Sequence, residues 1–197
     1  MASILKVDTI QDQSGNNIIN ENADTITIGA SGDTIAIPTG ATLTVPSGKL
    51  TGQNYPAFFA KVSGTQSVTN NVATKAECDT EVLDTDGYYD NATNYRFTPL
   101  VAGKYYVYGF VVGDGSNSTL VATQSYIYKN GSAYIQNYAI PSNNYGATDG
   151  PFVACIVDMN GTTDYIELYG RTNVNSGSAQ FFGGDLYTSF GAYRIGD

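Results

Sequence analysis

The sequence predicts an all-β protein built as a sandwich of short antiparallel strands. Of its 197 residues, 22 are glycine and 16 are tyrosine, and only 14% are charged, a composition that suits a turn-rich β protein. From residue 57 onward, short runs of aromatic and β-branched residues alternate with turn formers, and no apolar run has the 3.6-residue period of a helix. Strands are expected near residues 57–62, 74–78, 80–83, 95–98, 103–112, 120–129, 132–139, 151–159, 163–171 and 186–195.

Residues 1–22 contain too little apolar surface to form an independent fold. This segment resembles the N-terminal segment of many marine bacteriophage fibre and virion-surface proteins, in which it precedes unrelated C-terminal modules. The resemblance implies that the segment attaches the protein to a capsid or tail protein of the virion. The expected anchor is its small apolar cluster of Ile4, Leu5, Val7 and Ile10.

Residues 23–55 contain a short repeat followed by a neck. Three copies of polar/apolar alternation at 25–28, 34–37 and 42–45 are separated by turn formers, and residues 46–56 are rich in turn formers. Each copy contributes only two apolar side chains, too few to bury a core within one chain. A trimeric β-stalk is favoured over a loosely packed three-stranded sheet. The expected stalk core consists of Ile26, Ile28, Ile35, Ile37, Leu43 and Val45.

Residues 56–197 are expected to form the head, a sandwich whose strands have jelly-roll spacing. Asn130-Gly131 and Asn160-Gly161 are predicted to be hairpin turns, because Asn and Gly tolerate the positive φ that tight turns require. The stretch Gly113-Asp114-Gly115-Ser116 is interpreted as a loop.

The strand at 103–112 is apolar or aromatic on both of its faces. An antiparallel strand with one wet face should alternate apolar with polar residues. The strands at 151–159 and 186–195 share this property, so the three are expected to form one sheet covered by the sandwich core on one side and by neighbouring subunits on the other. The predicted trimer interface consists of Tyr106, Tyr108, Phe110, Ile156, Phe190 and Tyr193.

The spacing of Phe97, Gly103, Tyr105 and Val107 resembles the signature of the globular head of the complement first component. That head belongs to the tumour-necrosis-factor-like (TNF-like) jelly rolls, and the resemblance covers residues 56–197. Segments resembling other parts of that family lie in order at 89–91, 128–131 and 188–193. The resemblance implies a trimer that binds through its outer surface and loops. Val107 departs from the aromatic residue usual in that family.

Composition excludes several classes of function. The net charge of −9, with nine scattered basic residues, argues against nucleic-acid partners and anionic membrane surfaces. The absence of histidine excludes Ser-His-Asp and Cys-His relays and His-ligated zinc, and no cofactor motif is present. Cys78 and Cys155 lie in apolar runs, which favours buried free thiols over a disulfide. No signal peptide or transmembrane run is visible, so synthesis in a cytoplasm without ordinary export, and no membrane insertion, are expected.

Carboxylates are the remaining chemical candidates. Asp84, Asp86 and Asp90 have an oxygen-rich spacing that could hold calcium, although the pattern lacks the terminal glutamate of a twelve-residue calcium loop. A solvated turn is the simpler interpretation. Two carboxylates could also cleave a glycan, but such enzymes usually need a much longer chain to form a substrate groove.

These observations predict a non-enzymatic, trimeric bacteriophage virion protein displayed on the particle surface and assembled in the host bacterial cytoplasm. It would decorate the capsid as a head fibre or form a short fibre. The alternative is a receptor-binding tail-fibre head that recognises host surface glycans. Tyrosines in or near polar turns could stack on sugars in that case, namely Tyr88, Tyr134, Tyr138 and Tyr145.

Overall fold

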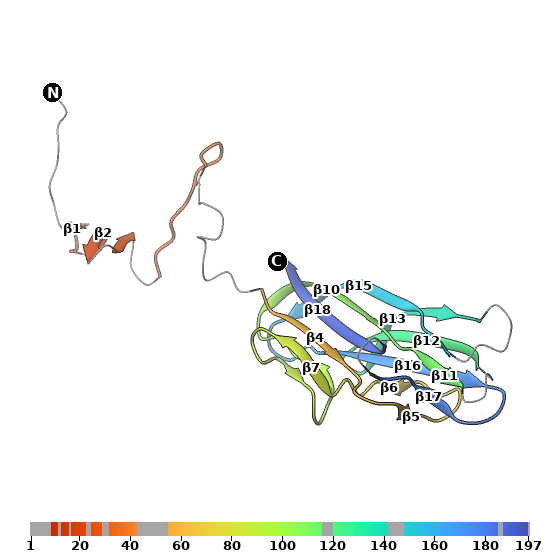
Figure 1. The fold of residues 1–197 in the computed structure, drawn as a ribbon. Helices are drawn as coiled ribbons and strands as arrows, with labels where there is room; N and C mark the ends of the chain where they lie inside the picture. The colour runs from red at the N-terminus through yellow and green to blue at the C-terminus, as the bar shows by residue number, and fades with distance from the viewer. Residues whose placement is uncertain are drawn as a thin grey trace. The chain divides into compact units, whose positions relative to one another are not determined.

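The computed structural model divides the chain into two compact units, Met1–Gly52 and Gln53–Asp197 (Figure 1). The described residues are 9–11, 13–15, 17–22, 25–28, 32–42, 55–115, 120–141, 148–184 and 187–196. All regular structure among them is β, which confirms the predicted fold class. No described residue belongs to a helix long and apolar enough to cross a membrane.

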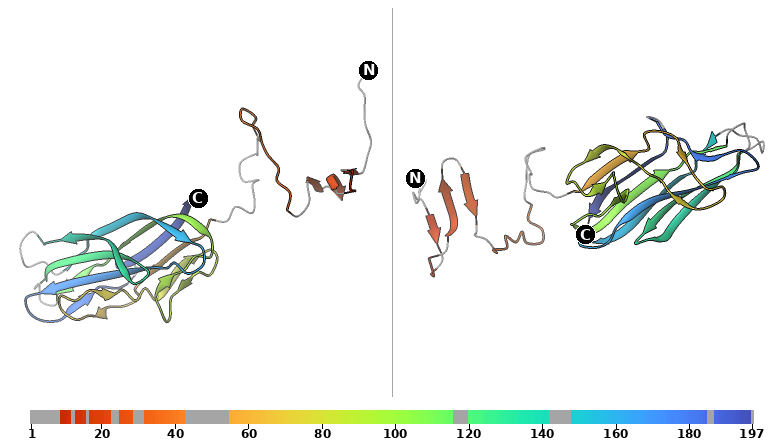
Figure 2. Two further views of the ribbon diagram at one scale, coloured as in Figure 1. Left: turned by 180° about the vertical axis from the view of Figure 1, so that it is seen from behind. Right: turned by 90° about the horizontal axis from the view of Figure 1, so that it is seen from below.

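The N-terminal unit contains a three-stranded antiparallel sheet of β1 (Thr9–Gln11), β2 (Asn17–Asn22) and β3 (Thr25–Ile28), visible as three adjacent arrows in Figure 2. The first predicted repeat copy is therefore a strand, but it pairs antiparallel with β2 of the preceding segment. Residues 33–38 do not form the strand expected at 34–37. Within one chain, no described strand pairs with the second repeat copy at residues 34–37.

Two main sheets build the head, and they face each other as the layers of a sandwich (Figures 1 and 2). The first sheet has the order β15-β10-β18-β4-β7. Its strands are β15 (Phe152–Asn160), β10 (Ala102–Phe110), β18 (Ser189–Gly196), β4 (Ala57–Lys61) and β7 (Thr80–Asp84). The three strands predicted to form one sheet are adjacent in it, with β10 between β15 and β18.

The second sheet has the order β13-β12-β16-β9-β8, and β6 also pairs with β16. Its strands are β13 (Ser132–Ala139), β12 (Leu120–Lys129), β16 (Ile166–Val174), β9 (Arg96–Phe97), β8 (Tyr89–Asp90) and β6 (Thr74–Lys75). A third, small sheet has the order β14-β11-β17-β5, formed by β14 (Thr148–Asp149), β11 (Gly113–Gly115), β17 (Ala179–Phe181) and β5 (Gln66–Ser67).

Two details of the predicted connections are wrong. Gly113–Gly115 is a strand rather than a loop, because it finds partners on both sides, in β14 and β17. Asn130-Gly131 is the expected hairpin turn, with φ of 51° and 76°. Asn160-Gly161, in contrast, connects β15 of the first sheet to β16 of the second. The Asn160 side chain accepts the backbone N–H groups of residues 162–164 and so shapes that crossover.

Aromatic side chains from both layers fill the centre of the sandwich. The Phe58 ring stacks on Tyr89 and Phe97 of the second sheet, with ring centroids 4.6 and 4.5 Å apart, and meets Phe190 edge-on at 4.9 Å. Edge-to-face and offset pairs of this kind contribute beyond the area they bury. The Tyr89 hydroxyl donates to the Cys78 carbonyl at 3.0 Å, so its polar end is satisfied inside the core.

Candidate functional site

The outer face of the first sheet carries rows of cross-strand neighbours, and most of the large side chains in these rows are apolar or aromatic. One row places Phe59 and Tyr108 on either side of Gly191. The next row aligns Tyr193, Tyr106 and Ile156. Because partners in register share a face, these rings form a continuous surface. Ring centroids are 6.4 Å apart for Phe59 and Tyr108, 5.9 Å for Tyr108 and Tyr106, and 5.5 Å for Tyr106 and Tyr193.

Tyr108 lies directly over the backbone of Gly191. A Cβ added to Gly191 would lie 2.6 Å from both the Cζ and the hydroxyl oxygen of Tyr108, and 3.0 Å from the Phe58 carbonyl oxygen. Glycine therefore leaves the space that the tyrosine ring occupies. Burial raises the pKa of Tyr108, and the neighbouring Tyr193 and Tyr106 hydroxyls add to that shift.

Apolar groups on this face remain open to solvent in one chain. Ile156 is 55% exposed, Phe152 53% and Tyr193 46%, while Tyr106, Tyr108 and Phe110 are half-buried. Such a gathering of exposed apolar side chains is typical of an interaction surface. Five of the six residues predicted for the trimer interface lie on this face; whether they contact another subunit stays a prediction.

Phe190 is the exception and corrects the predicted face. It is fully buried in the sandwich core, where it packs against Phe58. Its register partner is Gly109, which belongs to the inward row of β10. A Cβ on Gly109 would lie 2.8 Å from Leu168 Cδ1 and 3.4 Å from Phe190 Cδ2, so Phe190 occupies inward space beside a glycine. Strand alternation then places Tyr193, three residues later, on the opposite face.

The edges of the two main sheets meet along β13 and β15. Side chains of the second sheet donate to β15 carbonyl groups: Asn137 to Phe152 at 2.7 Å, Tyr134 to Ile156 at 3.4 Å, and Lys129 to Asp158 at 2.6 Å. These bonds cover a strand edge that would otherwise offer free acceptors to another chain.

The four tyrosines expected to suit sugar stacking lie in different environments. Tyr134 and Tyr138 are exposed on the edge strand β13. Tyr88 is half-buried near Phe97 and lines a hollow of about 330 Å³ with Arg96 and Leu100. Tyr145 lies outside the described residues. The structure therefore does not bring the three described tyrosines into one site.

The aspartates with calcium-like spacing stabilise turns instead. Asp84 accepts the backbone N–H groups of Gly87 at 3.0 Å and Tyr89 at 2.7 Å. Asp90 accepts those of residues 92–94, and these bonds, led by that of Thr93, lower the pKa of Asp90 to about 2. Asp86 accepts the Thr85 hydroxyl. Within the described residues, no three acidic or thiol side chains are grouped as a metal site would require.

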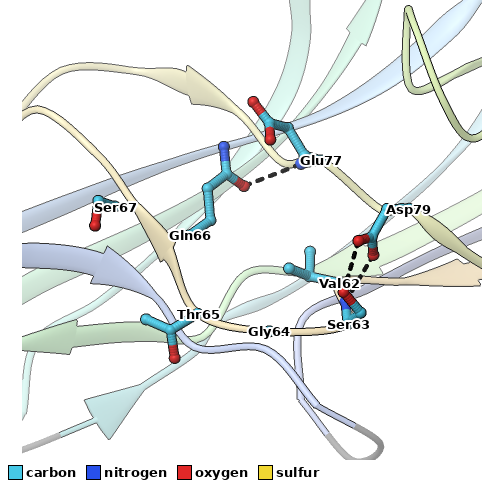
Figure 3. Close-up of a pocket in the computed structure, with 8 residues that line it drawn as sticks. All are labelled: Val62, Ser63, Gly64, Thr65, Gln66, Ser67, Glu77 and Asp79. Carbon is cyan, nitrogen blue, oxygen red and sulfur yellow. Dashed lines mark hydrogen bonds between the residues drawn. The ribbon is translucent and has the colours of Figure 1, made fainter.

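A polar hollow of about 340 Å³ lies between β5 and the segment that precedes β7 (Figure 3). The Asp79 carboxylate accepts the Ser63 hydroxyl at 2.6 Å and its backbone N–H at 2.7 Å. Burial raises the pKa of Asp79, but the Ser63 bonds outweigh it and lower the pKa overall. Figure 3 shows the Glu77 carboxylate pointing away from Asp79, so the two acids do not face a common point as a glycosidase pair would.

Both cysteines are free thiols, as favoured from the sequence. Cys78 is buried in the core, where desolvation raises its pKa strongly. Cys155 is half-buried, and burial raises its pKa to about 11. Thiolates are the reactive form, so neither group is activated for chemistry.

The outer face of the second sheet contains a group of residues that the sequence patterns did not single out. Tyr128 and Tyr169 stack with ring centroids 3.9 Å apart, and Tyr126 meets Tyr128 edge-on at 6.0 Å. Glu167 is buried on this face and pairs with Lys75 at 2.5 Å. In the sequence, the order Tyr126-Ile127-Tyr128 on a predicted strand places the two tyrosines on one face, and this was a usable signal.

The other predicted residues lie in the N-terminal unit. In one chain Ile28, Ile35 and Ile37 are exposed, at 53%, 59% and 47%, and Ile10 is 41% exposed. Ile26 belongs to β3. Leu43 and Val45 of the expected stalk core, and Ile4, Leu5 and Val7 of the expected anchor, lie outside the described residues.

Comparison with known proteins identifies the fold. No protein-family model matches the sequence, and no curated protein matches it. Among solved structures, murine APRIL matches with a TM-score of 0.53 and 13% identity over 72% of this chain and 100% of that chain. The TNF Eiger of S. frugiperda matches with a TM-score of 0.51 and 11% identity over 73% and 92% of the two chains. The globular domain of zebrafish complement 1qA matches with a TM-score of 0.52 and 12% identity over 71% and 97%. The head is therefore a TNF-like jelly roll, the fold that the sequence predicts.

Proposed function

We propose that this chain is a non-enzymatic bacteriophage virion protein whose jelly-roll head forms a homotrimer on the particle surface. The observation that carries the proposal is the open aromatic face of the first sheet, formed by Phe59, Tyr106, Tyr108, Ile156 and Tyr193. A head displayed alone would leave this face in water, whereas assembly removes it from solvent at a gain of about 25 cal/mol for each Å² of apolar area, before ordering costs.

A three-fold assembly also needs a second, different surface on each chain, because contacts in a closed ring of three are head-to-tail. The edge formed by β13 and β15 is the candidate. It presents Tyr134 and Ile135, each more than a third exposed, and the Phe152 and Ile156 carbonyls of β15 already accept side-chain hydrogen bonds. It can therefore pack against the aromatic face without adding a strand to it.

The N-terminal unit supports the same assembly. Ile28, Ile35 and Ile37 are exposed in one chain, and side chains of this kind require partner chains to bury them. Three copies wound about one axis would supply those partners and form the stalk. Residues 1–22 would then attach the trimer to a capsid or tail protein, as their resemblance to virion proteins implies.

Capsid decoration, as a head fibre or short fibre assembled in the bacterial cytoplasm, is the use we favour. The turn-capping roles of Asp84 and Asp90 and the divergent acids of the polar hollow give no support to an enzymatic or metal-dependent role. A glycan turnover assay should accordingly detect no cleavage.

Two measurements test this proposal. Light scattering coupled to size exclusion should give a mass of three chains for the full protein, and a stable monomer would refute the assembly. Gold-labelled antibody against the head, viewed on whole phage particles by electron microscopy, should mark the capsid. Label confined to the tail would instead favour the second candidate function.

That second candidate is a receptor-binding head that recognises host surface glycans. The exposed Tyr134 and Tyr138 on β13 favour it, because tyrosine offers an apolar ring with a polar end to a wet ligand. A glycan array separates the two uses, since decoration alone requires no glycan binding.

A further inference from the structure

The outer face of the second sheet presents two polar rows beside the stacked tyrosines. In one row Tyr138, Gln124 and Arg171 are cross-strand neighbours on β13, β12 and β16. In the next row Gln136, Tyr126 and Tyr169 are aligned in the same way. Side chains in register share a face, so amides, phenol rings and one guanidinium gather on a patch two rows wide.

Arg171 has no ion pair and no hydrogen bond within the part of the chain that the structure describes. Its partners in register and on its own strand are Gln124, Tyr169 and Asn173, all uncharged. The nearest acid on β16, Glu167, already pairs with Lys75. In a protein of net charge −9, a half-buried guanidinium without a carboxylate partner is available to an anion from outside.

The groups next to Arg171 are held in place. The Tyr126 hydroxyl donates to Gln124 Oε1 at 2.6 Å, which fixes the phenol ring along β12. Gln124 is 8% exposed, so its amide is covered on most sides. Its oxygen is taken by Tyr126, while its nitrogen makes no hydrogen bond to other described residues. Burial raises the pKa of Tyr126, and the positive charge of Arg171 partly offsets that rise.

We propose that this patch, formed by Gln124, Tyr126, Tyr138 and Arg171, binds a carboxylate-bearing sugar unit of an acidic polysaccharide. The guanidinium pairs with the sugar carboxylate in a bidentate manner, and Gln124 holds the Tyr126 phenol in place beside it. The exposed Tyr138 ring at the edge of the patch packs against the apolar face of a sugar ring. This site does not depend on trimer assembly or on the virion location.

Other polyanions fit the patch less well. Nucleic acids present one phosphate after another and require a broad cationic surface, which a single free guanidinium does not supply. An acidic peptide would pair with Arg171 but would leave the amide and phenol groups without a specific partner. The mixture of one cation, amides and aromatic rings matches the mixture of carboxylate, hydroxyls and apolar ring faces on an acidic sugar.

Isothermal titration of the full-length protein with three probes tests the proposal. These are oligogalacturonate, a neutral malto-oligosaccharide and poly-L-glutamate. Oligogalacturonate should bind most tightly of the three. Arg171→Gln should weaken that binding at least tenfold, because hydrogen bonds to charged groups are the strong ones. Arg171→Lys should restore binding only in part, because lysine keeps the charge and loses the planar fork.

Lys104→Gln is the matched control, since it removes one positive charge from the other sheet and should leave the affinity within twofold. Tyr138→Ala, at an exposed edge position, should weaken binding without altering the thermal midpoint or the mass in solution. Failure of oligogalacturonate to bind, equal binding by Arg171→Gln, or preference for the neutral sugar or for poly-L-glutamate would each overturn the proposal. Sizing of the same samples tests assembly separately, so the two failures can be told apart.

Discussion

The two sheets of the head both present tyrosines outward, yet they place them among different neighbours. On the first sheet, Tyr106 and Tyr108 lie beside Phe59, Ile156 and a glycine. On the second, Tyr126 and Tyr169 lie beside amides, Arg171 and an ion pair. The neighbours of an outward-facing tyrosine therefore indicate what it suits better than its exposed fraction does. Apolar neighbours suit a protein–protein interface, and polar neighbours suit a hydrated polar ligand.

The largest loss of stability should come from a substitution in the core between the two sheets. Phe58→Ala removes a fully buried ring that contacts Tyr89, Phe97 and Phe190, and should lower the free energy of unfolding by about 3–5 kcal/mol. Phe59→Ala, on the outer face of the same strand, is the control and should cost the isolated fold clearly less. Chemical denaturation of both variants measures this. Equal losses would mean that the two faces of β4 are not distinct.

Assembly should depend on the outer face of the first sheet and not on the outer face of the second. Tyr108→Asp places a carboxylate on the aromatic face and should weaken association by about 3–5 kcal/mol, because a charge in a closed interface has no partner. Tyr126→Asp makes the same change on the other sheet and should leave the mass in solution unchanged. Light scattering of the two variants decides between the faces. A trimeric Tyr108→Asp protein would show that the interface lies elsewhere.

The ion pairs of the two sheets should also differ in how much they contribute to the free energy of unfolding. Glu167→Gln leaves Lys75 without the buried carboxylate that it contacts, and should cost about 1–3 kcal/mol. Asp158→Asn removes the acid of the exposed Lys104–Asp158 pair, at 3.7 Å on the first sheet, and should cost under about 0.5 kcal/mol. Thermal denaturation at low and high salt compares them, and salt should not change this order. A larger loss for Asp158→Asn would contradict the burial argument.

Lowering the pH should reduce the folding stability of the head because it protonates the Asp90 carboxylate. Its folded pKa is about 2, below the unfolded value of about 3.9, so its contribution is present above pH 4 and is lost as the pH falls toward 2. After solvent screening this contribution is about 1 kcal/mol. Asp90→Asn should remove it near neutral pH and flatten the dependence of the melting temperature on pH between pH 4 and 2. Asp86→Asn is the control, and an equal response from it would argue against the role of Asp90.

Removal of calcium by a chelator is expected to have no effect on the stability of the head. The Asp84 and Asp90 oxygens already accept backbone N–H groups, so removal of calcium should leave the melting temperature unchanged. A clear drop in the presence of chelator, reversed by added calcium, would show that these turns hold a metal.

Most of the fold could be predicted because strand alternation is a local property. The strands at 120–129 and 132–139 were expected with the bounds they have, since a hairpin turn and continuous aromatic patterns define both ends. Short strands such as Gly113–Gly115 could not be found, because their strand state comes from partners far along the chain. The same is true of Phe190, whose inward direction is set by its register with Gly109.

The candidate sites depend even more on strand pairing between distant parts of the chain, which local sequence patterns do not reveal. The lack of polar/apolar alternation identified the aromatic face on β10 and β15, because the side chains on both faces of these strands are largely apolar or aromatic. The patch around Arg171 could not be predicted, because Tyr138, Gln124 and Arg171 come from three strands that only the sheet brings together. The pairing of Lys75 with Glu167, 92 positions later, likewise depends on the packing of β6 beside β16.

The fit of Tyr108 over Gly191 has an evolutionary consequence. The two positions are linked through one small volume, because any side chain at 191 would enter the space of the ring at 108. Among homologous heads that conserve this face, glycine at 191 should accompany an aromatic residue at 108, and a larger residue at 191 should accompany a smaller one at 108. A pair of positions 83 residues apart would then covary, and their joint identity would report which homologues share this surface.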